Sequence, residues 1–350
     1  MSVTILVLLG RSVWREAWGG RPLTIGAILF FLGLATPSHA VIYYSTADVN
    51  YNTTAPTGAL AGSGWQWVGE WIGFQGTAIG PNHFLTAKHV GGSVGNPFVY
   101  RGVSYTTTAV INDSVSDLSI WQVAGTMPDW APLYRGSDEV GKSLVVFGRG
   151  LTRGSEVRVN GILKGWMWGS GDGRLRWGEN TVRTLIYSGP TLGDLLYATL
   201  DAGAGPNEAH LAVGDSSGPI FINDGSGWKL AGVAYSVDAY FSYSGGSDPG
   251  FIAALFDCRA LYFGSAGGWN LIQSALPVPT GFYASRVSAR VNWIDSIVPP
   301  ASPVTVVHRV DALPPLASLL AAFALAGIGF AALRKSGSPK PRRPRIVPSR

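Results

Sequence analysis

Three short segments of the chain carry side chains that together could turn a hydroxyl group into a nucleophile. They are residues 84–90, which contain His89, residues 116–120, which contain Asp117, and residues 214–219, which contain two adjacent serines. A serine hydroxyl attacks poorly at neutral pH unless a base within hydrogen-bond reach takes its proton. An imidazole can take and return that proton, and a carboxylate on its other nitrogen fixes the tautomer and stabilises the imidazolium. The segments therefore supply a base, an acid that can orient it and a hydroxyl nucleophile.

Each segment alone is weak evidence, because lone histidines are more often structural and Gly-Asp-Ser is a common tripeptide. The combination is more specific, since the histidine, the aspartate and the serine follow one another in that order. Alternatives stay open within and beside the segments. Ser216 and Ser217 are both candidate nucleophiles. Asp113 is a second candidate acid, although only Asp117 opens an apolar strand.

These segments must be held by a fold made of short strands. Apolar runs of strand length alternate with Gly, Asn, Asp and Pro, as at residues 71–74, 98–100, 143–147 and 219–222. Glycine, which accepts positive φ in tight turns, accounts for 47 of the 350 residues, and only 13% of residues are charged. This composition excludes a disordered chain and a coiled coil. We predict an all-β body without a helix of about 12 or more residues inside it.

The three segments resemble those of the trypsin/chymotrypsin-like serine proteases. Residues 86–90 (TAKHV) are similar to that family's Thr-Ala-Ala-His-Cys, and residues 117–120 (DLSI) are similar to its Asp-Ile-Ala-Leu. Residues 214–219 (GDSSGP) are similar to its Gly-Asp-Ser-Gly-Gly-Pro. The order of the three residues along the chain is also that of chymotrypsin. The resemblance covers roughly residues 65–240.

The resemblance implies a role for each residue of the site. His89 would be the general base, Asp117 the orienting acid and Ser216 the nucleophile, with Ser217 as the second choice. The backbone N–H groups of Gly214 and Ser216 would form an oxyanion hole, in which each donor can contribute about 3 kcal/mol.

The resemblance also implies a fold and a reaction. The domain at 41–297 would contain two six-stranded β-barrels of the chymotrypsin type, at roughly 65–140 and 141–297. Its activity would be that of a serine endopeptidase, which hydrolyses a protein or peptide substrate through an acyl-enzyme intermediate. We expect no cofactor, since the sequence has no metal-ligand cluster and no phosphate-binding glycine loop. A catalytically silent binding module with a protease-like fold is the alternative, and a structural surface protein with an accidental match is the third.

Three residues depart from the family pattern near the site. Lys88 replaces a small residue beside the base, and Val90 replaces a cysteine, so the family's disulfide is absent there. Ser217 occupies a glycine position in the turn after the nucleophile. The short interval between His89 and Asp117 implies trimmed loops in the first barrel.

By the same resemblance, the floor of the specificity pocket lies six residues before the nucleophile, where this chain has His210. The wall of the pocket would lie near Tyr235, Ser236 and Val237. Without a carboxylate at the floor, a preference for Arg or Lys is not expected. Whether His210 favours acidic or small side chains, or is only a structural histidine, stays open.

Activation in the animal enzymes pairs a freed apolar N-terminus with the aspartate just before the nucleophile, which is Asp215 here. Cleavage after Ala40 would expose Val41 for such a pair. The polar stretch from Ser45 to Thr57 argues against this pairing.

The two ends of the chain predict export. Residues 23–35 form an uncharged apolar run behind a basic segment, and a small-x-small site ends at Ala40, as is typical of a signal peptide at 1–40. Residues 316–333 are 18 uncharged residues followed by a basic tail. That length suits a transmembrane helix, and the tail favours a cytoplasmic C-terminus. We therefore expect the body in the periplasm or at the cell surface, with the membrane as a partner of the helix.

The C-terminal region combines a Pro-rich spacer at 298–315 with the apolar helix and basic tail at 316–350. Two prolines immediately before the helix and the basic residues behind it resemble the bacterial PEP-CTERM/VPLPA class of sorting signals. In that class a membrane enzyme recognises and removes the tail, so a C-terminal sorting enzyme is an expected partner. An ordinary single-span anchor is the alternative.

Charge and the remaining reactive residues add two expectations. Of 26 basic and 21 acidic residues, ten basic and one acidic lie in the two ends, which leaves 16 basic and 20 acidic residues at 22–333. Such a body does not suit phosphate binding, so no nucleic acid partner is expected. The one cysteine, Cys258, is expected as a buried apolar thiol, and His83 and His308 as surface or loop residues.

Overall fold

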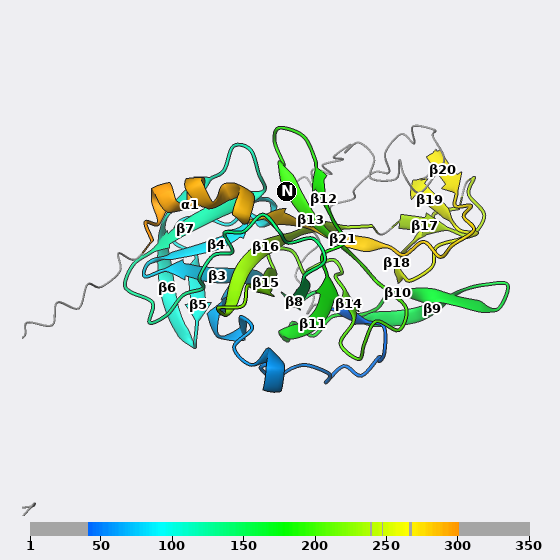
Figure 1. Cartoon of the computed structure of the whole chain (residues 1–350), viewed down its shortest axis with the longest axis horizontal. Coiled ribbons are helices and arrows are strands. Elements are labelled where there is room, and N and C mark those ends of the chain that lie inside the picture. Colours follow the sequence, from blue (N-terminus) through cyan, green and yellow to red (C-terminus); the bar gives the residue numbers. More distant parts are fainter. Residues whose placement is uncertain (1–40, 239, 247, 266–267, 301–350) are drawn as a thin grey trace, which may run out of the picture. The chain divides into compact units, whose positions relative to one another are not determined.

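The computed structural model describes residues 41–300 except 239, 247, 266 and 267 (Figure 1). The chain divides into two compact units at Pro300, and all the described residues belong to the first unit. The predicted signal peptide at 1–40 and the predicted transmembrane helix at 316–333 lie outside the described residues, as does most of the Pro-rich spacer.

Strands dominate the described residues, which confirms the predicted all-β body. The one α-helix among them is α1 (Val291–Ile297), which is too short to contradict the expectation of no long helix. Four short 3-10 helices accompany it: η1 (Gly58–Leu60), η2 (Trp65–Trp67), η3 (Lys88–Val90) and η4 (Ser288–Arg290). No helix in the described part of the chain is long and apolar enough to cross a membrane.

A closed six-stranded barrel forms the first half of the described domain. Its strands are β2 (Val68–Trp71), β3 (Phe74–Gly80), β4 (His83–Ala87), β5 (Pro97–Tyr100), β6 (Val103–Asn112) and β7 (Leu118–Val123). They pair antiparallel in the order β2-β3-β4-β7-β6-β5 and back to β2. The β5–β6 hairpin turns through Arg101 and Gly102, which both have positive φ, and such turns match the twist of paired strands. This barrel agrees with the first of the two that the sequence led us to expect.

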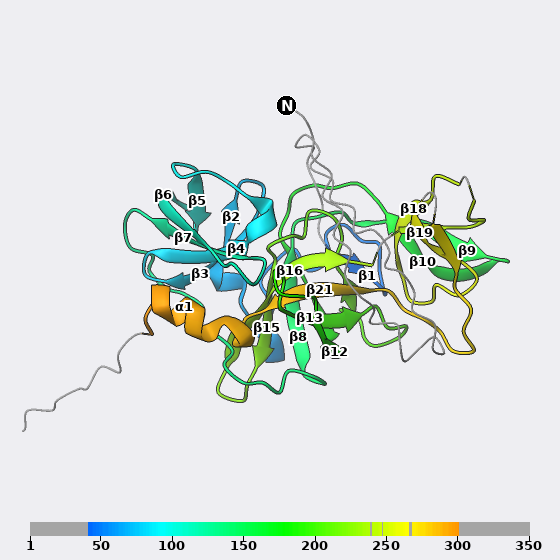
Figure 2. The same cartoon turned by 90° about the horizontal axis from the view of Figure 1, so that it is seen from above.

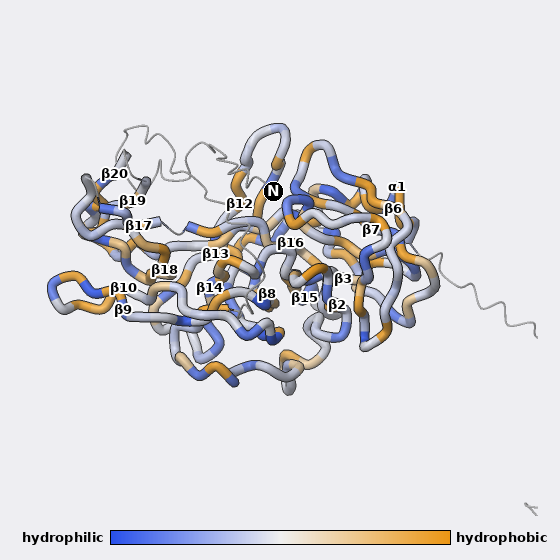
Figure 3. Tube along the Cα trace, turned by 180° about the vertical axis from the view of Figure 1, so that it is seen from behind, coloured by the Kyte–Doolittle hydropathy of each residue, from blue (hydrophilic) through white to orange (hydrophobic). Residues whose placement is uncertain are grey.

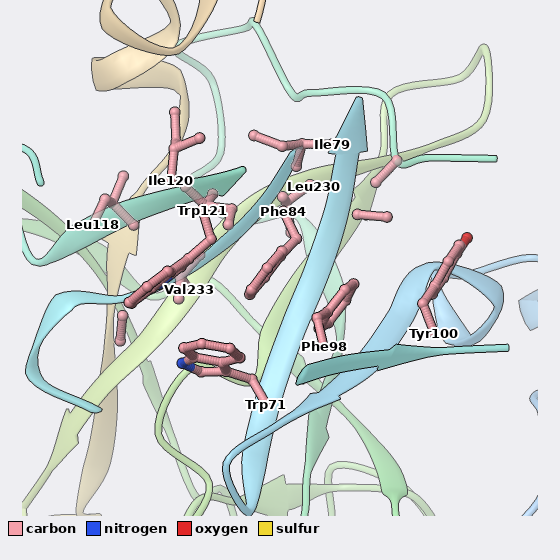
Figure 4. Close-up of a cluster of buried hydrophobic side chains, with 14 of the residues drawn as sticks. Trp71, Ile79, Phe84, Phe98, Tyr100, Leu118, Ile120, Trp121, Leu230 and Val233 are labelled. Carbon is pink, nitrogen blue, oxygen red and sulfur yellow. The ribbon is translucent and has the colours of Figure 1, made fainter. Parts of the chain in front are cut away.

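Aromatic rings fill this barrel (Figure 4). Phe84 and Phe98 stack with their ring centroids 3.9 Å apart, and the buried rings of Trp71 and Trp121 lie 4.5 Å from each other. Gly69 leaves room for the stack, because a Cβ at this position would lie 2.3 Å from the Phe98 ring. The core fixes β4 and β7, the neighbouring strands that lead to the predicted base and acid.

The second half is built on a seven-stranded sheet in the order β11-β8-β15-β16-β21-β13-β12. Its strands are β8 (Ser143–Gly148), β11 (Arg176–Thr181), β12 (Thr184–Tyr187), β13 (Asp194–Thr199), β15 (Pro219–Asn223), β16 (Trp228–Val237) and β21 (Gly281–Arg286). When β12 is left out, the other six strands repeat the circuit of the first barrel. If the six strands of each half are numbered 1 to 6 along the chain, both halves have the circular order 1-2-3-6-5-4. In the second half, strand 1 is β8, strand 2 is β11 and strand 3 is β13.

The second half differs from the expected closed six-stranded barrel in how its circuit ends. The third strand of the circuit, β13, pairs with β21 on one side and with β12 on the other, so neither of its edges is left for β11. The strands β11 and β13 still meet through a side chain, because Asn180 Nδ2 donates to Thr199 O at 2.8 Å. The backbone pairing therefore stays open between β11 and β13.

A six-stranded sheet in the order β20-β19-β17-β18-β10-β9 was not anticipated from the sequence. Its strands are β9 (Arg153–Val159), β10 (Ile162–Trp168), β17 (Tyr240–Ser242), β18 (Phe251–Leu255), β19 (Tyr262–Ser265) and β20 (Gly268–Leu271). They come from two insertions, one between β8 and β11 and one between β16 and β21, which join where β10 pairs with β18. Figure 2 shows this sheet on the side of the seven-stranded sheet away from the first barrel.

The two ends of the described chain both return to these sheets. The strand β1 (Ile42–Tyr43) pairs with β14 (Ala209–His210) beside the seven-stranded sheet. After β21, the chain crosses back through η4 and α1, and Val287, Ile294 and Val298 are buried in the hydrophobic cluster that includes the core of the first barrel. Apolar stretches on α1 and on the strands of both halves are visible in Figure 3.

Candidate active site

His89 and Asp117 lie at the same end of two neighbouring strands. His89 follows β4 in η3, Asp117 precedes β7, and the pairing of Ala87 with Leu118 brings the two side chains together. His89 Nδ1 lies 2.5 Å from Asp117 Oδ2, and the backbone N–H of His89 donates to Asp117 Oδ1 at 3.0 Å. The side chains are only 13% and 4% exposed. A carboxylate held in this way can fix the imidazole tautomer and stabilise the imidazolium form.

Asp113, the second candidate acid, faces a different partner. Its carboxylate accepts two hydrogen bonds from the Arg290 guanidinium, at 2.5 and 2.8 Å, and one from Ser116 Oγ at 2.5 Å. Burial acts to raise its pKa, but the hydrogen bonds from Arg290 and Ser116 prevail and hold the pKa of Asp113 below its usual range. The carboxylate that bonds to His89 therefore belongs to Asp117.

Ser216 and Ser217 have different surroundings in the turn between β14 and β15. Ser216 is partly exposed, whereas Ser217 is buried, and its Oγ accepts a hydrogen bond from Ala87 N at 3.0 Å. The backbone of Ser217 has a φ of 68°, which explains why the similar family motif has glycine here. The hydroxyl of Ser217 is thus engaged in joining the turn to the segment that carries His89.

A buried glutamine on β3 also holds this turn. In the orientation that satisfies both of its partners, the Gln75 amide donates to Ser216 O at 3.0 Å and accepts from Arg149 N at 2.6 Å. Gln75 thus links the first barrel to two segments of the second half. Sequence reasoning missed this residue, and its only signal was a polar side chain in the small and apolar run 74–80.

The backbone around Ser216 leaves two N–H groups available. Among the described residues, neither Gly214 N–H nor Ser216 N–H donates to another protein group, and both residues are partly exposed. Gly214 has a φ of 92°, a conformation that favours glycine. Two donors so close in the chain can stabilise one developing oxyanion.

The side chain of Asp215 points into the protein, where the first described residue of the chain meets it. Asp215 accepts from Val41 N at 3.3 Å, from Gly150 N at 2.7 Å and from Ala212 N at 2.8 Å. Burial raises the pKa of Asp215 to about 7. Among the described residues, only backbone N–H groups donate to this carboxylate, although the charge of Arg176 acts to lower its pKa.

The polar stretch from Ser45 to Thr57 was expected to keep Val41 away from Asp215, and the structure shows the opposite. The stretch lies along the second half, where Asn52 Nδ2 donates to Trp177 O at 3.0 Å and Trp177 Nε1 donates to Thr54 O at 2.8 Å. These bonds hold the N-terminal segment against the second half. There β1 pairs with β14, and Val41, the residue before β1, reaches Asp215.

The residues expected at the specificity pocket differ in their surroundings. His210 is fully buried, with Nδ1 2.5 Å from Leu211 O and Nε2 3.3 Å from Thr280 Oγ1. Burial lowers the pKa of His210 to about 4, so the imidazole is neutral at neutral pH. Of the readings left open by the sequence, the structural histidine fits this environment.

The expected wall residues lie on β16. The ring of Tyr235 meets the His89 ring edge-on, with the centroids 5.7 Å apart. The Tyr235 and Ser236 hydroxyl oxygens are buried without a hydrogen-bond partner in the part of the chain that the structure describes. Val237 is partly buried and pairs with Phe282 of β21. Tyr235 therefore contacts the predicted base itself.

The other reactive residues lie apart from this site. Cys258 is buried, its Sγ donates to Val278 O at 2.9 Å, and burial raises the pKa of the thiol. His83 is half-buried on β4 rather than at the surface, and burial lowers its pKa, while His308 lies outside the described residues. No group of three or more His, Cys, Asp or Glu side chains among residues 41–300, gaps excepted, could hold a metal ion.

Comparison with known proteins does not assign the chain to a family. No protein-family model matches it, and no curated protein is significantly similar to it.

Proposed function

We propose that this protein is an exported serine endopeptidase of the trypsin/chymotrypsin-like kind. The observation that carries the proposal is the His89–Asp117 pair, joined to the Ser216 turn through the hydrogen bond between Ala87 N and Ser217 Oγ. Base, acid and nucleophile come from three distant segments in the order that the sequence motif requires. Their convergence is hard to explain for a structural surface protein with an accidental match.

The strand circuit supports the fold that this proposal needs. Both halves follow the same order of strands, and the second half departs from it only where β12 occupies the edge of β13. We regard the second half as a barrel of the same type that is open between β11 and β13. In that arrangement the first half contributes the base and acid, and the second contributes the nucleophile.

The reaction follows from the positions of these groups. Ser216 Oγ attacks the carbonyl carbon of the scissile peptide bond while His89 takes its proton, and Asp117 stabilises the imidazolium that forms. The N–H groups of Gly214 and Ser216 donate to the oxyanion of the tetrahedral intermediate. His89 then protonates the leaving amine, which departs and leaves an acyl-enzyme. Water attacks this ester with His89 again as base, which releases the acid product and restores Ser216.

Activation is part of the proposal. Cleavage after Ala40 would convert the peptide nitrogen of Val41 into a free α-ammonium group, 3.3 Å from Asp215 Oδ2. That cation would supply the charged partner that the buried carboxylate lacks, because a buried charge is stable only when it is paired. Removal of the signal peptide would then complete the site.

The proposed location and partners follow from the sequence. A signal peptide at 1–40 exports the domain to the periplasm or cell surface, and the helix at 316–333 tethers it to the membrane or presents it to a sorting enzyme. The substrate is a protein or peptide. The buried and neutral His210 offers no charge to a substrate side chain, so we do not propose a charged residue on the acyl side of the cleaved bond.

The test of this function is peptide hydrolysis by two serine variants of the mature protein. Ser216→Ala should lower kcat by roughly 10⁶, as expected when a nucleophile is removed from a triad. Ser217→Ala should retain activity within about tenfold, since it loses one neutral hydrogen bond. The opposite pattern in folded variants would contradict the assignment, and a folded wild-type protein without any hydrolysis would favour the binding module.

A further inference from the structure

The loop at residues 113–116, directly before Asp117, is held from two directions. From the side of the base, Lys88 Nζ donates to Asp113 O at 2.8 Å and to Ser116 O at 2.7 Å. From the C-terminal end of the domain, the Arg290 guanidinium forms its two hydrogen bonds to the Asp113 carboxylate. We call these contacts of Lys88 and Arg290 with the loop the acid-loop clamp.

The clamp is continuous with the His89–Asp117 pair. Lys88 N donates to Asp117 O at 2.9 Å, so the main chain and the side chain of Lys88 both hold the segment that carries the acid. His89 is the next residue, and its own N–H and ring nitrogen bond to the same carboxylate. A displacement of the loop would therefore change the distance between the carboxylate and the imidazole.

Burial makes the clamp strong. The Asp113 side chain is only 1% exposed and that of Arg290 is 25% exposed, so water cannot readily replace either partner. A bidentate bond between a guanidinium and a carboxylate fixes orientation as well as distance. Removal of one partner would leave an uncompensated buried charge, which is strongly unfavourable. The loop would relieve this by moving Asp113 toward solvent.

We infer that Lys88 and Arg290 are positioning residues for the His89–Asp117 pair, an inference that rests on the proposed protease function. Lys88 is the departure from the family motif for which the sequence offered no reason, and its ammonium group supplies the loop with two hydrogen bonds. Arg290 makes the C-terminal segment of the domain a support of the catalytic acid. Both side chains bond to the loop directly before Asp117, so each acts on the pair through Asp117.

The test compares Arg290→Gln and Lys88→Met with Arg135→Gln in the mature domain. Arg135 is a matched control, because it forms an equally direct two-bond pair with Asp295 of α1, at 2.7 and 2.8 Å, without touching the loop. We expect Arg290→Gln and Lys88→Met to slow fluorophosphonate labelling by about tenfold or more and to lower kcat with KM unchanged. Arg135→Gln should stay within about twofold, and Lys88→Arg should restore part of the loss.

A second readout reports on the pair without catalysis. The proton between His89 Nδ1 and Asp117 should give a low-field resonance in the proton NMR spectrum of the wild type. Loss of a contact far from this pair would not shift that resonance. We expect this resonance to shift or broaden in Arg290→Gln and Lys88→Met and to persist in Arg135→Gln. Should Arg290→Gln fail to fold, Arg290→Lys retains a charged donor and is expected to show a smaller change of the same kind.

The outcomes separate the clamp from the proposed function. The wild type and the folded clamp variants could be labelled at the same rate and show the same resonance. In that case the positioning role of Lys88 and Arg290 is wrong, and the proposed protease function stands. If Arg135→Gln is as slow as Arg290→Gln, docking of the helix and not the clamp is responsible, which also overturns the inference. A folded wild type that never labels overturns the function, and the clamp is then decided by the resonance alone.

Discussion

The first barrel positions the proposed base and acid mainly with its own strands, whereas the second half positions its serine turn with help from elsewhere in the chain. His89 and Asp117 flank the paired strands β4 and β7, over a closed aromatic core. The turn at Ser216 is bonded to Gln75 in the first barrel, and Asp215 is bonded to Val41 at the beginning of the described chain. The proposed base and acid thus belong to one barrel, while the position of the proposed nucleophile depends on contacts from several parts of the domain.

This difference follows the construction of the two halves. The first barrel is closed, and the C-terminal segment supports it from outside at Arg290 and α1. The second half is open between β11 and β13 and carries two insertions that form a separate sheet. An open sheet constrains its turns less than a closed barrel does. Contacts from distant segments therefore become important for the turn that carries Ser216.

Within the first barrel, the largest effect is expected at the proposed acid. Asp117→Asn should lower kcat by roughly 10⁴, because the imidazole would be held in the wrong tautomer although the geometry is kept. The measurement is steady-state hydrolysis of a peptide ester or amide. As a control, Asp129→Asn removes a half-exposed carboxylate of the same barrel that pairs with Arg101, and it should leave kcat nearly unchanged. Equal losses in both variants would contradict the special role of Asp117.

The next effect concerns the N-terminal partner of the second half. A mature protein that begins with one extra residue before Val41 should be about a hundredfold to several thousandfold less active, since a buried charge without its partner costs about 3–5 kcal/mol. Active-site titration of the two proteins, made with defined N-termini, measures this loss. Full activity of the extended protein would show that the backbone contact of Val41 with Asp215 suffices.

The same pair should appear in the pH dependence of stability. In the extended protein, burial raises the pKa of Asp215 to about 7, so the folded protein binds the proton of this carboxyl group more tightly than the unfolded chain does. Protonation of Asp215 therefore adds at most about 4 kcal/mol to the free energy of unfolding. This contribution is complete below the pKa of about 4 in the unfolded chain, and it is lost as the pH rises through about 7. Urea unfolding at pH 5 and pH 8 should show the loss in the extended protein and a much smaller loss in the protein that begins at Val41.

A smaller effect is expected from the link between the two halves. Gln75→Leu should lower kcat about tenfold, because it leaves Ser216 O and Arg149 N without their buried partner, at a cost of about 1–3 kcal/mol. The rate of labelling at a saturating concentration of a fluorophosphonate separates an effect on the Ser216 turn from an effect on substrate binding. An unchanged labelling rate in a folded Gln75→Leu variant would show that the turn is rigid without the first barrel.

The smallest effects are expected at Ser217. Ser217→Gly should be nearly neutral for stability, because relief of the strain at a φ of 68° offsets the lost hydrogen bond to Ala87 N. Ser217→Ala loses the bond and keeps the strain, so it should be less stable than Ser217→Gly by about 1–2 kcal/mol. Thermal unfolding of the pair measures this difference, and a more stable Ser217→Ala would contradict the account of the turn.

The residues that were predictable from sequence are those whose signal is local. The runs around His89, Asp117 and Ser216 each carry a motif, and alternating strands and turns indicated an all-β body. The contacts of Gln75 and Arg290 were not predictable, since they join segments far apart in the chain. The only local signal was the polar side chain of Gln75 in a small and apolar run, and it does not identify a partner. The added sheet was missed for the same reason, because the pairing of β10 with β18 joins two separate insertions. The docking of Val41 was not predictable from the polar stretch at 45–57, because the long-range hydrogen-bond partners of that stretch lie beyond residue 170.

The measurement that most directly tests the central claim, that the His89–Asp117 pair activates Ser216, is mass-spectrometric mapping of a fluorophosphonate adduct on the mature protein. We expect a single adduct on Ser216 in the wild type, with none in Ser216→Ala and at most trace labelling in His89→Ala. A folded wild-type protein that forms no adduct, or an adduct on Ser217, would contradict the claim.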